Sequence, residues 1–228
     1  MVRILSYNVH GCRGTDGVLS PHRIAEVIAA SGAEIVALQE LDVRRRRSGG
    51  IDQVEAIALA LGMDFHFHPA LRLIDEAYGD AVLTTCPMRL VKAGVLPESR
   101  LAGIALEPRG ALWVEVMAGA TPLQVINTHL GLLPHEQRIQ AACLLGPDWL
   151  GHPDCRDPAL LVGDLNAPAR SRTYRRFAAA LRDAACESRG VEPPRPTFPS
   201  RRPLMRLDHA FLRGGARVVS TEVVATPL

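Results

Sequence analysis

Several residue types are scarce in this 228-residue chain, and each scarcity excludes a class of protein. Only ten residues are aromatic, which leaves few side chains for the base stacking on which single-strand-binding proteins rely. The five cysteines are scattered and none forms a C-x-x-C pair, so neither a disulfide framework nor a zinc ribbon is indicated. No run approaches about 18 uninterrupted apolar residues, and no secretory signal is visible. A cytoplasmic protein without a transmembrane segment is therefore expected.

The chain also lacks a large excess of charge of either sign. The chain has 26 basic and 24 acidic residues, a net charge of +2 that excludes nucleic-acid binding through bulk charge alone. The basic residues are 25 arginines and a single lysine, Lys92. This bias fits the composition of a GC-rich genome, and it also fits selection for phosphate binding, because guanidinium groups match phosphate oxygens bidentately. Composition does not decide between the two.

The apolar residues that are present, 47% of the chain, indicate an ordinary globular protein. Ser20 and Pro21 predict the start of a helix that Gly32 can end. Further helices are predicted at 53–61, 135–145 and 173–181. Strands are predicted at 2–7, 34–38, 64–68, 81–85, 90–95, 111–116, 123–127, 159–162, 207–212 and 218–224. This mixture, without a flexible linker, favours one α/β domain over residues 1–228.

One pattern occurs twice along the chain. Residues 4–11 and 125–131 are each an apolar strand ending in Asn-x-His, followed by a helix. After each helix comes another apolar strand that ends in an acid, first Glu40 and then Asp164. Ligands of α/β folds sit at the carboxyl ends of strands, so two such halves facing each other would bring their polar side chains together. The predicted set is Asn8, His10, Glu40, Asn127, His129, Asp164 and Asn166.

The chemistry of this set indicates a metal-assisted reaction. Carboxylate and amide oxygens suit a hard cation, Mg²⁺ or Mn²⁺, better than zinc. The last predicted strand adds a further acid and imidazole, Asp208 and His209. Such a group can hydrolyse a phosphate ester, because the cation neutralises charge, a carboxylate orients the attacking water and imidazoles move protons.

Five motifs carry a family resemblance. They are Ser6-Tyr7-Asn8-Val9-His10-Gly11, Gln39-Glu40-Leu41-Asp42, Asn127-Thr128-His129-Leu130, Gly163-Asp164-Leu165-Asn166-Ala167 and Leu207-Asp208-His209-Ala210-Phe211. In this order they resemble the endonuclease/exonuclease/phosphatase superfamily, and they cover residues 4 to 212. The resemblance implies a DNase I-like α/β fold, a four-layer sandwich of two packed mixed β-sheets flanked by helices. It also implies Mg²⁺-dependent phosphoester hydrolysis, in which Mn²⁺ can substitute.

The resemblance also implies roles for the residues at the metal. Glu40 would be the principal metal ligand, with Asn8 and Asp208 near it. Asp164 would orient or activate the nucleophilic water, and Asn166 would hold Asp164 in place and contact the substrate.

Two histidines would act on the phosphate itself. By the same resemblance, His209 would face the scissile phosphate and stabilise its developing charge. His129 matches the position that several branches of the superfamily use to protonate the leaving group. Asp183 lies where the family often has an acid that orients the final histidine.

Substrate contacts are implied for Tyr78 and Arg109. Tyr78 matches a frequent phosphate contact, and Arg109 resembles a family segment in which it is either a substrate contact or a structural residue. Asp80 departs from the family, which often has Asn there. An acid at this position would repel a phosphate unless it were protonated or bound to metal.

The substrate itself stays open between two hydrolase hypotheses and one non-catalytic one. A nuclease is favoured because arginines flank two of the motifs: Arg170, Arg172, Arg175 and Arg176 after the fourth, and Arg201, Arg202 and Arg206 before the fifth. Hydrolysis of a phospholipid head group or small phosphate ester suits the compact chain and the small net charge. A phosphate-binding scaffold is the third hypothesis, which the intact ligand set disfavours.

Overall fold

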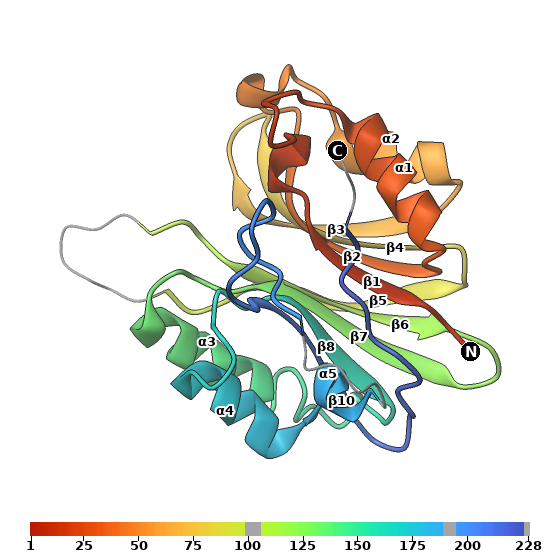
Figure 1. The fold of residues 1–228 in the computed structure, drawn as a ribbon, viewed down its shortest axis with the longest axis vertical. Coiled ribbons are helices and arrows are strands. Elements are labelled where there is room, and N and C mark those ends of the chain that lie inside the picture. Colours follow the sequence, from red (N-terminus) through yellow and green to blue (C-terminus); the bar gives the residue numbers. More distant parts are fainter. Residues whose placement is uncertain (99–105, 189–194, 226–228) are drawn as a thin grey trace.

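The computed structural model describes residues 1–98, 106–188 and 195–225, and these form two packed β-sheets (Figure 1). The first sheet has four strands in the order β1-β2-β4-β3: Ile4–Asn8, Ile35–Val43, Ala77–Thr84 and Asp64–Arg72. The second has six strands in the order β5-β6-β7-β8-β10-β9: Met88–Val95, Gly110–Met117, Pro122–His129, Ala159–Asp164, Asp208–Arg213 and Arg182–Asp183. Each sheet contains one parallel pair, β1 with β2 and β7 with β8.

Helices cover the two outer faces, as Figure 1 shows. The helices are α1 Pro21–Ser31, α2 Gln53–Leu61, α3 Pro134–Leu145, α4 Arg172–Ala180 and α5 Ala184–Glu187, with short 3₁₀ turns η1 His10–Cys12 and η2 Arg46–Ser48. One apolar cluster lies between α1, α2 and the first sheet, and another between α3, α4 and the second sheet. A third joins the two sheets. The expected four-layer sandwich of two mixed β-sheets flanked by helices is confirmed.

Helix boundaries follow the capping signals in the sequence. The Ser20 hydroxyl accepts a hydrogen bond from the Arg23 backbone N–H, and Pro21 fills the first turn of α1. Gly32 ends the helix with φ 66°, a left-handed conformation that favours glycine. Helix α2 begins after Asp52, whose carboxylate accepts from the Glu55 N–H, and its observed bounds equal the predicted ones.

One predicted strand is wrong. Residues 218–224 form no strand, although their valines suggested one. The neighbouring β10 already pairs with β8 on one side and β9 on the other, so no open edge is left for another strand beside it. All five cysteines are free, two of them buried. Within the described residues, no helix combines the length and the apolar character that a membrane crossing requires.

Candidate active site

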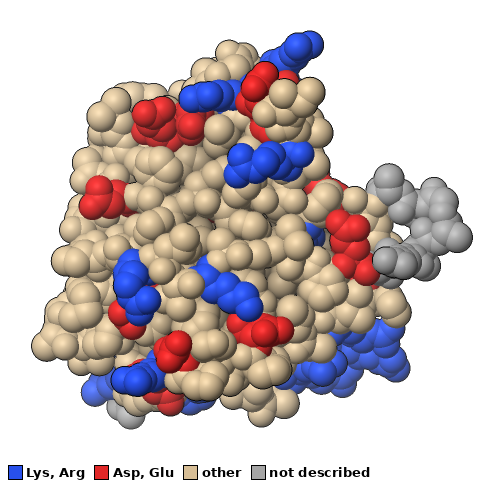
Figure 2. Space-filling view, turned by 180° about the vertical axis from the view of Figure 1, so that it is seen from behind, with Lys and Arg blue, Asp and Glu red and all other residues tan. Residues whose placement is uncertain are grey.

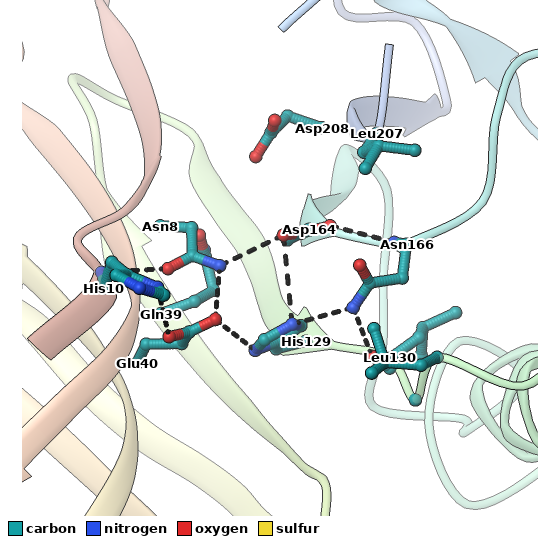
Figure 3. A network of polar contacts seen from close by, with 12 residues as sticks. Asn8, His10, Gln39, Glu40, His129, Leu130, Asp164, Asn166, Leu207 and Asp208 are labelled. Atoms are coloured by element: carbon teal, nitrogen blue, oxygen red, sulfur yellow. Dashed lines mark hydrogen bonds and ion pairs between the residues drawn. The ribbon is translucent and has the colours of Figure 1, made fainter. Parts of the chain in front are cut away.

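The carboxyl ends of the two parallel strand pairs meet between the sheets. Strand β1 lies against β8, and β2 lies against both β7 and β8. Asn8 is the last residue of β1, His129 of β7 and Asp164 of β8, while Glu40 lies in the carboxyl-terminal part of β2. Because all four strands deliver polar side chains to the same edge, the two repeated halves face each other across one site, as Figure 3 shows.

Asn8 connects the two halves directly. Its Nδ2 donates to Glu40 Oε1 at 2.8 Å and to Asp164 Oδ2 at 3.0 Å. Its Oδ1 accepts from the His10 backbone N–H at 3.0 Å, which fixes the orientation of the amide. The two carboxylates are therefore held on either side of one amide group, with like charges that repel each other unless something positive lies between them.

The backbone is unusual at two of these positions. Glu40 has φ 62°, and the pairing of β2 with β4 shifts there, from Leu38 opposite Ala81 to Leu41 opposite Gly79. Asn166 has φ 48° and its N–H donates to Asp164 Oδ1 at 2.8 Å. A left-handed conformation in a non-glycine residue is costly and persists only where the surroundings impose it. The bulge turns the Glu40 side chain out of the strand and into the site.

His129 lies between the two carboxylates, with only 4% of its side chain exposed. Its Nδ1 is 3.9 Å from Glu40 Oε1 and its Nε2 is 3.8 Å from Asp164 Oδ2. The Arg109 guanidinium approaches Nδ1 at 2.9 Å, and Asn166 Nδ2 approaches Nε2 at 2.9 Å. A neutral imidazole accepts at only one nitrogen, so these two donors compete for one lone pair. Burial, aided by the charge of Arg109, lowers the pKa of His129 well below its ordinary value.

Asp208 completes the acidic edge, and in Figure 3 its side chain points toward the other carboxylates. It pairs directly opposite Asp164 across β10 and β8. Burial, together with the charge of Asp164, raises the pKa of Asp208 to about 7. The site therefore carries more negative charge than its own cations neutralise, which is the environment that binds a metal cation.

The oxygen donors of this site fit a Mg²⁺ ion that takes its remaining ligands from water and substrate phosphate. Among the described residues, no group of three or more His, Cys, Asp and Glu side chains is arranged to hold one metal ion. A Mg²⁺ ion usually takes only one or two carboxylates and fills its other positions with water and substrate phosphate. Glu40, with Asp208 or Asp164, supplies that number, and every donor is a hard oxygen, which disfavours zinc.

The expected substrate contacts lie beside this edge. Tyr78 is buried on β4, and the guanidinium groups of Arg45 and Arg47 lie over its ring at 5.9 and 5.1 Å. Arg109 is 7% exposed and bonds both Glu107 Oε1 and His129 Nδ1 at 2.9 Å. Both contacts of Arg109 are made by its Nη1, so it helps to build the site.

Asp80, the departure from the family pattern, is buried opposite the Glu40 bulge. Burial raises the pKa of Asp80 to about 8, against the opposing charge of Arg109. Near neutral pH the carboxyl group is therefore largely protonated. A protonated acid can donate to a phosphate oxygen as an Asn would, which removes the expected repulsion.

His209 makes no hydrogen bond or ion pair to the carboxylates among the described residues. It is 3% exposed, its Nε2 donates to the Ala167 carbonyl at 2.9 Å, and its ring packs against Tyr174 and Phe211. Within the described residues its Nδ1 has no hydrogen-bond partner. Burial, with the charge of Arg206, lowers the pKa of His209 to about 4. The side chain is therefore neutral and bonded to the loop that follows Asp164 and β8.

Asp183 has a different partner from the one expected. Its carboxylate accepts from the Arg206 guanidinium at 2.5 and 3.1 Å and from the Tyr174 hydroxyl at 2.8 Å. No hydrogen bond joins it to His209 within the described part of the chain. The link between the two runs through Tyr174, whose ring centroid is 5.3 Å from that of His209. A sequence motif predicts where an acid lies, but it does not predict the distant cation, here Arg206, that pairs with it.

Comparison with known proteins settles the family. The model of the endonuclease/exonuclease/phosphatase family matches residues 5–228. The chain belongs to that family. Its members are generally hydrolases that act on phosphoester bonds.

Individual relatives are distant. The uncharacterized protein YbhP of Escherichia coli is 23% identical over 96% of this chain and 87% of its own length. A solved family protein from Beutenbergia cavernae is 25% identical with a TM-score of 0.68, covering 92% of this chain, which spans only 64% of that one. A mannosyl-6-phosphatase from Bacteroides thetaiotaomicron shares the fold with a TM-score of 0.77 at 19% identity, over 99% of this chain and 90% of its own.

Two residues that hold the candidate site in place are not predicted from the sequence. Gln137 on α3 is buried and donates to the Asn166 carbonyl at 2.9 Å and to the Gly131 carbonyl at 3.0 Å. Thr197 accepts from the Asp208 N–H at 3.3 Å and so fixes the start of β10. The signal available for Gln137 is a glutamine at a buried helical position, which needs a partner of its own.

Proposed function

We propose that this chain is a Mg²⁺-dependent phosphodiester hydrolase whose substrate is DNA or RNA. The observation that carries the proposal is the Asn8 amide, which joins Glu40 of one sheet to Asp164 of the other. Two carboxylates held on one amide, with His129 beside both, give a phosphate a cation site and a water-orienting base at the same edge. The cytoplasmic location stays a prediction of the sequence.

The proposed ligand roles are those that the family resemblance implies, and the positions of the side chains are compatible with them. Glu40 would be the principal Mg²⁺ ligand, with Asn8 and Asp208 near it. The cation, when bound, neutralises charge on the phosphate and its developing transition state. Asp164 would orient the attacking water, and Asn166 fixes Asp164 through the hydrogen bond from its backbone N–H.

Other residues would act on the substrate or on the site around it. His129 would hydrogen-bond the phosphate or leaving group, a role that its low pKa and two competing donors favour over release of a proton. Tyr78 and Arg109 would contact the phosphate from β4 and from the start of β6. For His209 to reach a phosphate, its Nε2 would have to leave the Ala167 carbonyl. Asp183 would support His209 through Tyr174.

A second candidate substrate is a phospholipid head group or a small phosphate ester. The observation that favours it is the likeness in fold to a mannosyl-6-phosphatase over 99% of this chain and 90% of that one. Both candidate substrates would be hydrolysed at the same acidic edge, and they differ only in the groups attached to the phosphate.

A substrate panel tests the proposal. It contains bis(p-nitrophenyl) phosphate, abasic DNA, single-stranded DNA, RNA and phospholipid vesicles, each with Mg²⁺, Mn²⁺ or EDTA. We expect turnover of at least one nucleic acid that EDTA abolishes. Turnover of phospholipids or small esters alone would support the second candidate, and no EDTA-sensitive turnover on any member would leave the phosphate-binding scaffold. Glu40→Ala is the matched inactive variant, and His22→Ala is the control because His22 is exposed on α1, where it pairs with Glu26 of the same helix.

A further inference from the structure

Five arginines on the α3–α4 side of the molecule differ from most others in the chain. Arg138 lies on α3, and Arg170, Arg172, Arg175 and Arg176 lie on or just before α4. All are exposed, and within residues 1–98, 106–188 and 195–225 none makes an ion pair or side-chain hydrogen bond. Elsewhere, arginines such as Arg23, Arg47 and Arg213 are paired with acids. Unpaired charges concentrated on one side indicate a partner of opposite charge.

Helix α4 turns its arginines to one face. Arg172, Arg175 and Arg176 are spaced i, i+3 and i+4, while Thr173 and Phe177 are buried on the opposite face. Glu136, the acid of α3, is 2% exposed and contributes no surface charge, and α4 has no acid. In Figure 2 the basic side chains gather at the lower right, the side on which α3 and α4 lie. The surface is therefore basic without local neutralisation.

This surface continues into the candidate active site. A cavity of about 500 Å³ is lined by Arg138 and Arg172 and also by Asn166, the residue that bonds Asp164. Leu132, 70% exposed, and Pro168 add apolar area to its wall. A chain bound at the carboxylates can thus leave the site through this cavity and pass directly along α4.

We propose that the surface formed by Arg138, Arg170, Arg172, Arg175 and Arg176 binds the backbone of a nucleic-acid strand next to its scissile phosphate. The inference rests on the proposed function, whose substrate class it narrows. Guanidinium groups bind successive phosphates without reading sequence, and release of counterions makes such binding strongly salt-dependent.

An anionic membrane fits this surface less well. Helices that lie on membranes carry bulky apolar side chains on one exposed face. The exposed positions of α4 beyond the arginines are alanines 178–180, and its large apolar residue, Phe177, is fully buried. A hydrophilic polyanion is therefore the occupant that the side chains match.

The test measures binding separately from turnover. A fluorescein-labelled single-stranded 20-mer is titrated with protein in EDTA, and its anisotropy gives Kd at several salt concentrations. Arg172→Ala/Arg176→Ala should weaken binding by about tenfold at low salt, and two lost phosphate contacts should reduce the slope of log K against log salt by about 1.4. Arg156→Ala/Arg217→Ala loses the same charge and should change Kd less than twofold, because Arg156 precedes β8 and Arg217 follows β10, at the end of the sheet opposite Asp164.

The outcomes separate this inference from the proposed function. Equal losses of affinity in both double variants, or an unchanged slope of log K against log salt, would overturn the proposed binding surface. Tight binding to phosphatidylserine vesicles that depends on Arg172 and Arg176, without oligonucleotide binding, would also overturn it and assign the surface to membranes. EDTA-sensitive turnover of bis(p-nitrophenyl) phosphate by the unaltered protein tests the catalytic proposal independently, because this substrate is too small to span α4.

Discussion

The two repeated halves of the molecule use the same motif for opposite purposes. In the N-terminal half, β1–α1–β2, Asn8 bonds both carboxylates of the candidate site, while the His10 side chain is 81% exposed and contacts Glu40 alone of the two, at 3.2 Å. In the C-terminal half, β7–α3–β8, His129 lies in the site and Asn127 is fully buried. Asn127 donates to the Leu38 and Ala81 carbonyls and so ties the second sheet to the first.

The difference comes from where each first strand ends. Strand β1 ends at Asn8, and the η1 turn, with φ 50° at His10, then places the largely exposed His10 side chain against Glu40 Oε2. Strand β7 continues two residues further, to His129, so that Asn127 and His129 share one face of the strand. A shift of one strand end by two residues thus decides whether the Asn or the His of the motif contacts both Glu40 and Asp164.

Removing the carboxylate of either half should have the largest effect. Glu40→Gln and Asp164→Asn keep the side-chain size and delete one charge that acts on the metal or the water. Each should lower kcat on bis(p-nitrophenyl) phosphate by about 10²–10⁴-fold. The measurement is steady-state turnover, with circular dichroism to verify folding. If either variant kept more than half of the activity, that half would contribute no catalytic carboxylate.

The next effect compares two ion pairs, one beside each sheet. Asp42 with Arg47 and Asp183 with Arg206 each form a two-bond pair whose guanidinium lies over a tyrosine ring. Asp183→Ala leaves Arg206 buried without its acid and should lower the free energy of unfolding by about 3 kcal/mol. Urea denaturation measures it. Arg47 is half exposed, so Asp42→Ala should cost less, and equal costs would contradict the comparison.

Acid should weaken the Asp183 pair in a defined range. Burial alone would raise the pKa of Asp183, but hydrogen bonds from Arg206 and Tyr174 hold it below its ordinary value. A depressed folded pKa contributes stability that is complete above the unfolded value, about 3.9 for Asp, and lost as pH falls through the folded value. The stability gap between the unaltered protein and Asp183→Ala should therefore be constant above pH of about 4 and narrow below it.

Substitution of Asn127 should lower the free energy of unfolding more than substitution of Asn8 does, whereas substitution of Asn8 should lower turnover. Asn127→Ala strands two buried carbonyl groups between the sheets and should cost about 2 kcal/mol of unfolding free energy. Asn8→Ala removes a partly exposed amide and should cost under about 1 kcal/mol, while lowering turnover. Urea denaturation and kcat distinguish them. Similar stability losses would mean that the two asparagines are equivalent.

The smallest effect should separate the two histidines. His129→Ala removes one hydrogen-bonding group of a neutral imidazole and should lower kcat by about tenfold, equivalent to roughly 1.4 kcal/mol. His10→Ala removes a 3.2 Å contact to Glu40 Oε2, but 81% of the His10 side chain is exposed and exposed ion pairs are weak, so kcat should change less than twofold. Steady-state kinetics at pH 7 compares them. An equal loss in both variants would place His10 in the catalytic machinery.

The sequence predicts most helices and strands and the acidic edge from local signals, whereas the four layers are expected from the family resemblance. Apolar runs, the caps of α1 and α2 and the acids at strand ends are all read within a few residues. The repeated motif, in contrast, does not say whether its Asn or its His enters the site. That choice depends on the strand end, and boundaries follow from pairing with distant strands.

Other outcomes also depend on long-range partners. Asp183 meets Arg206, 23 residues away along the chain, instead of His209. Residues 218–224 have the valines of a strand but no free sheet edge to join. Burial opposite the Glu40 bulge raises the pKa of Asp80, and no sequence motif predicts that bulge.

The most direct test of the central claim, that the two halves build one catalytic centre, is a double-mutant cycle on kcat. It compares the unaltered protein, Glu40→Gln, Asp164→Asn and the double variant on bis(p-nitrophenyl) phosphate with Mg²⁺. Residues that act as one unit are strongly non-additive, so we predict that the double variant is no slower than the slower single variant. Losses that multiply in the double variant would show two independent contributions and contradict the account.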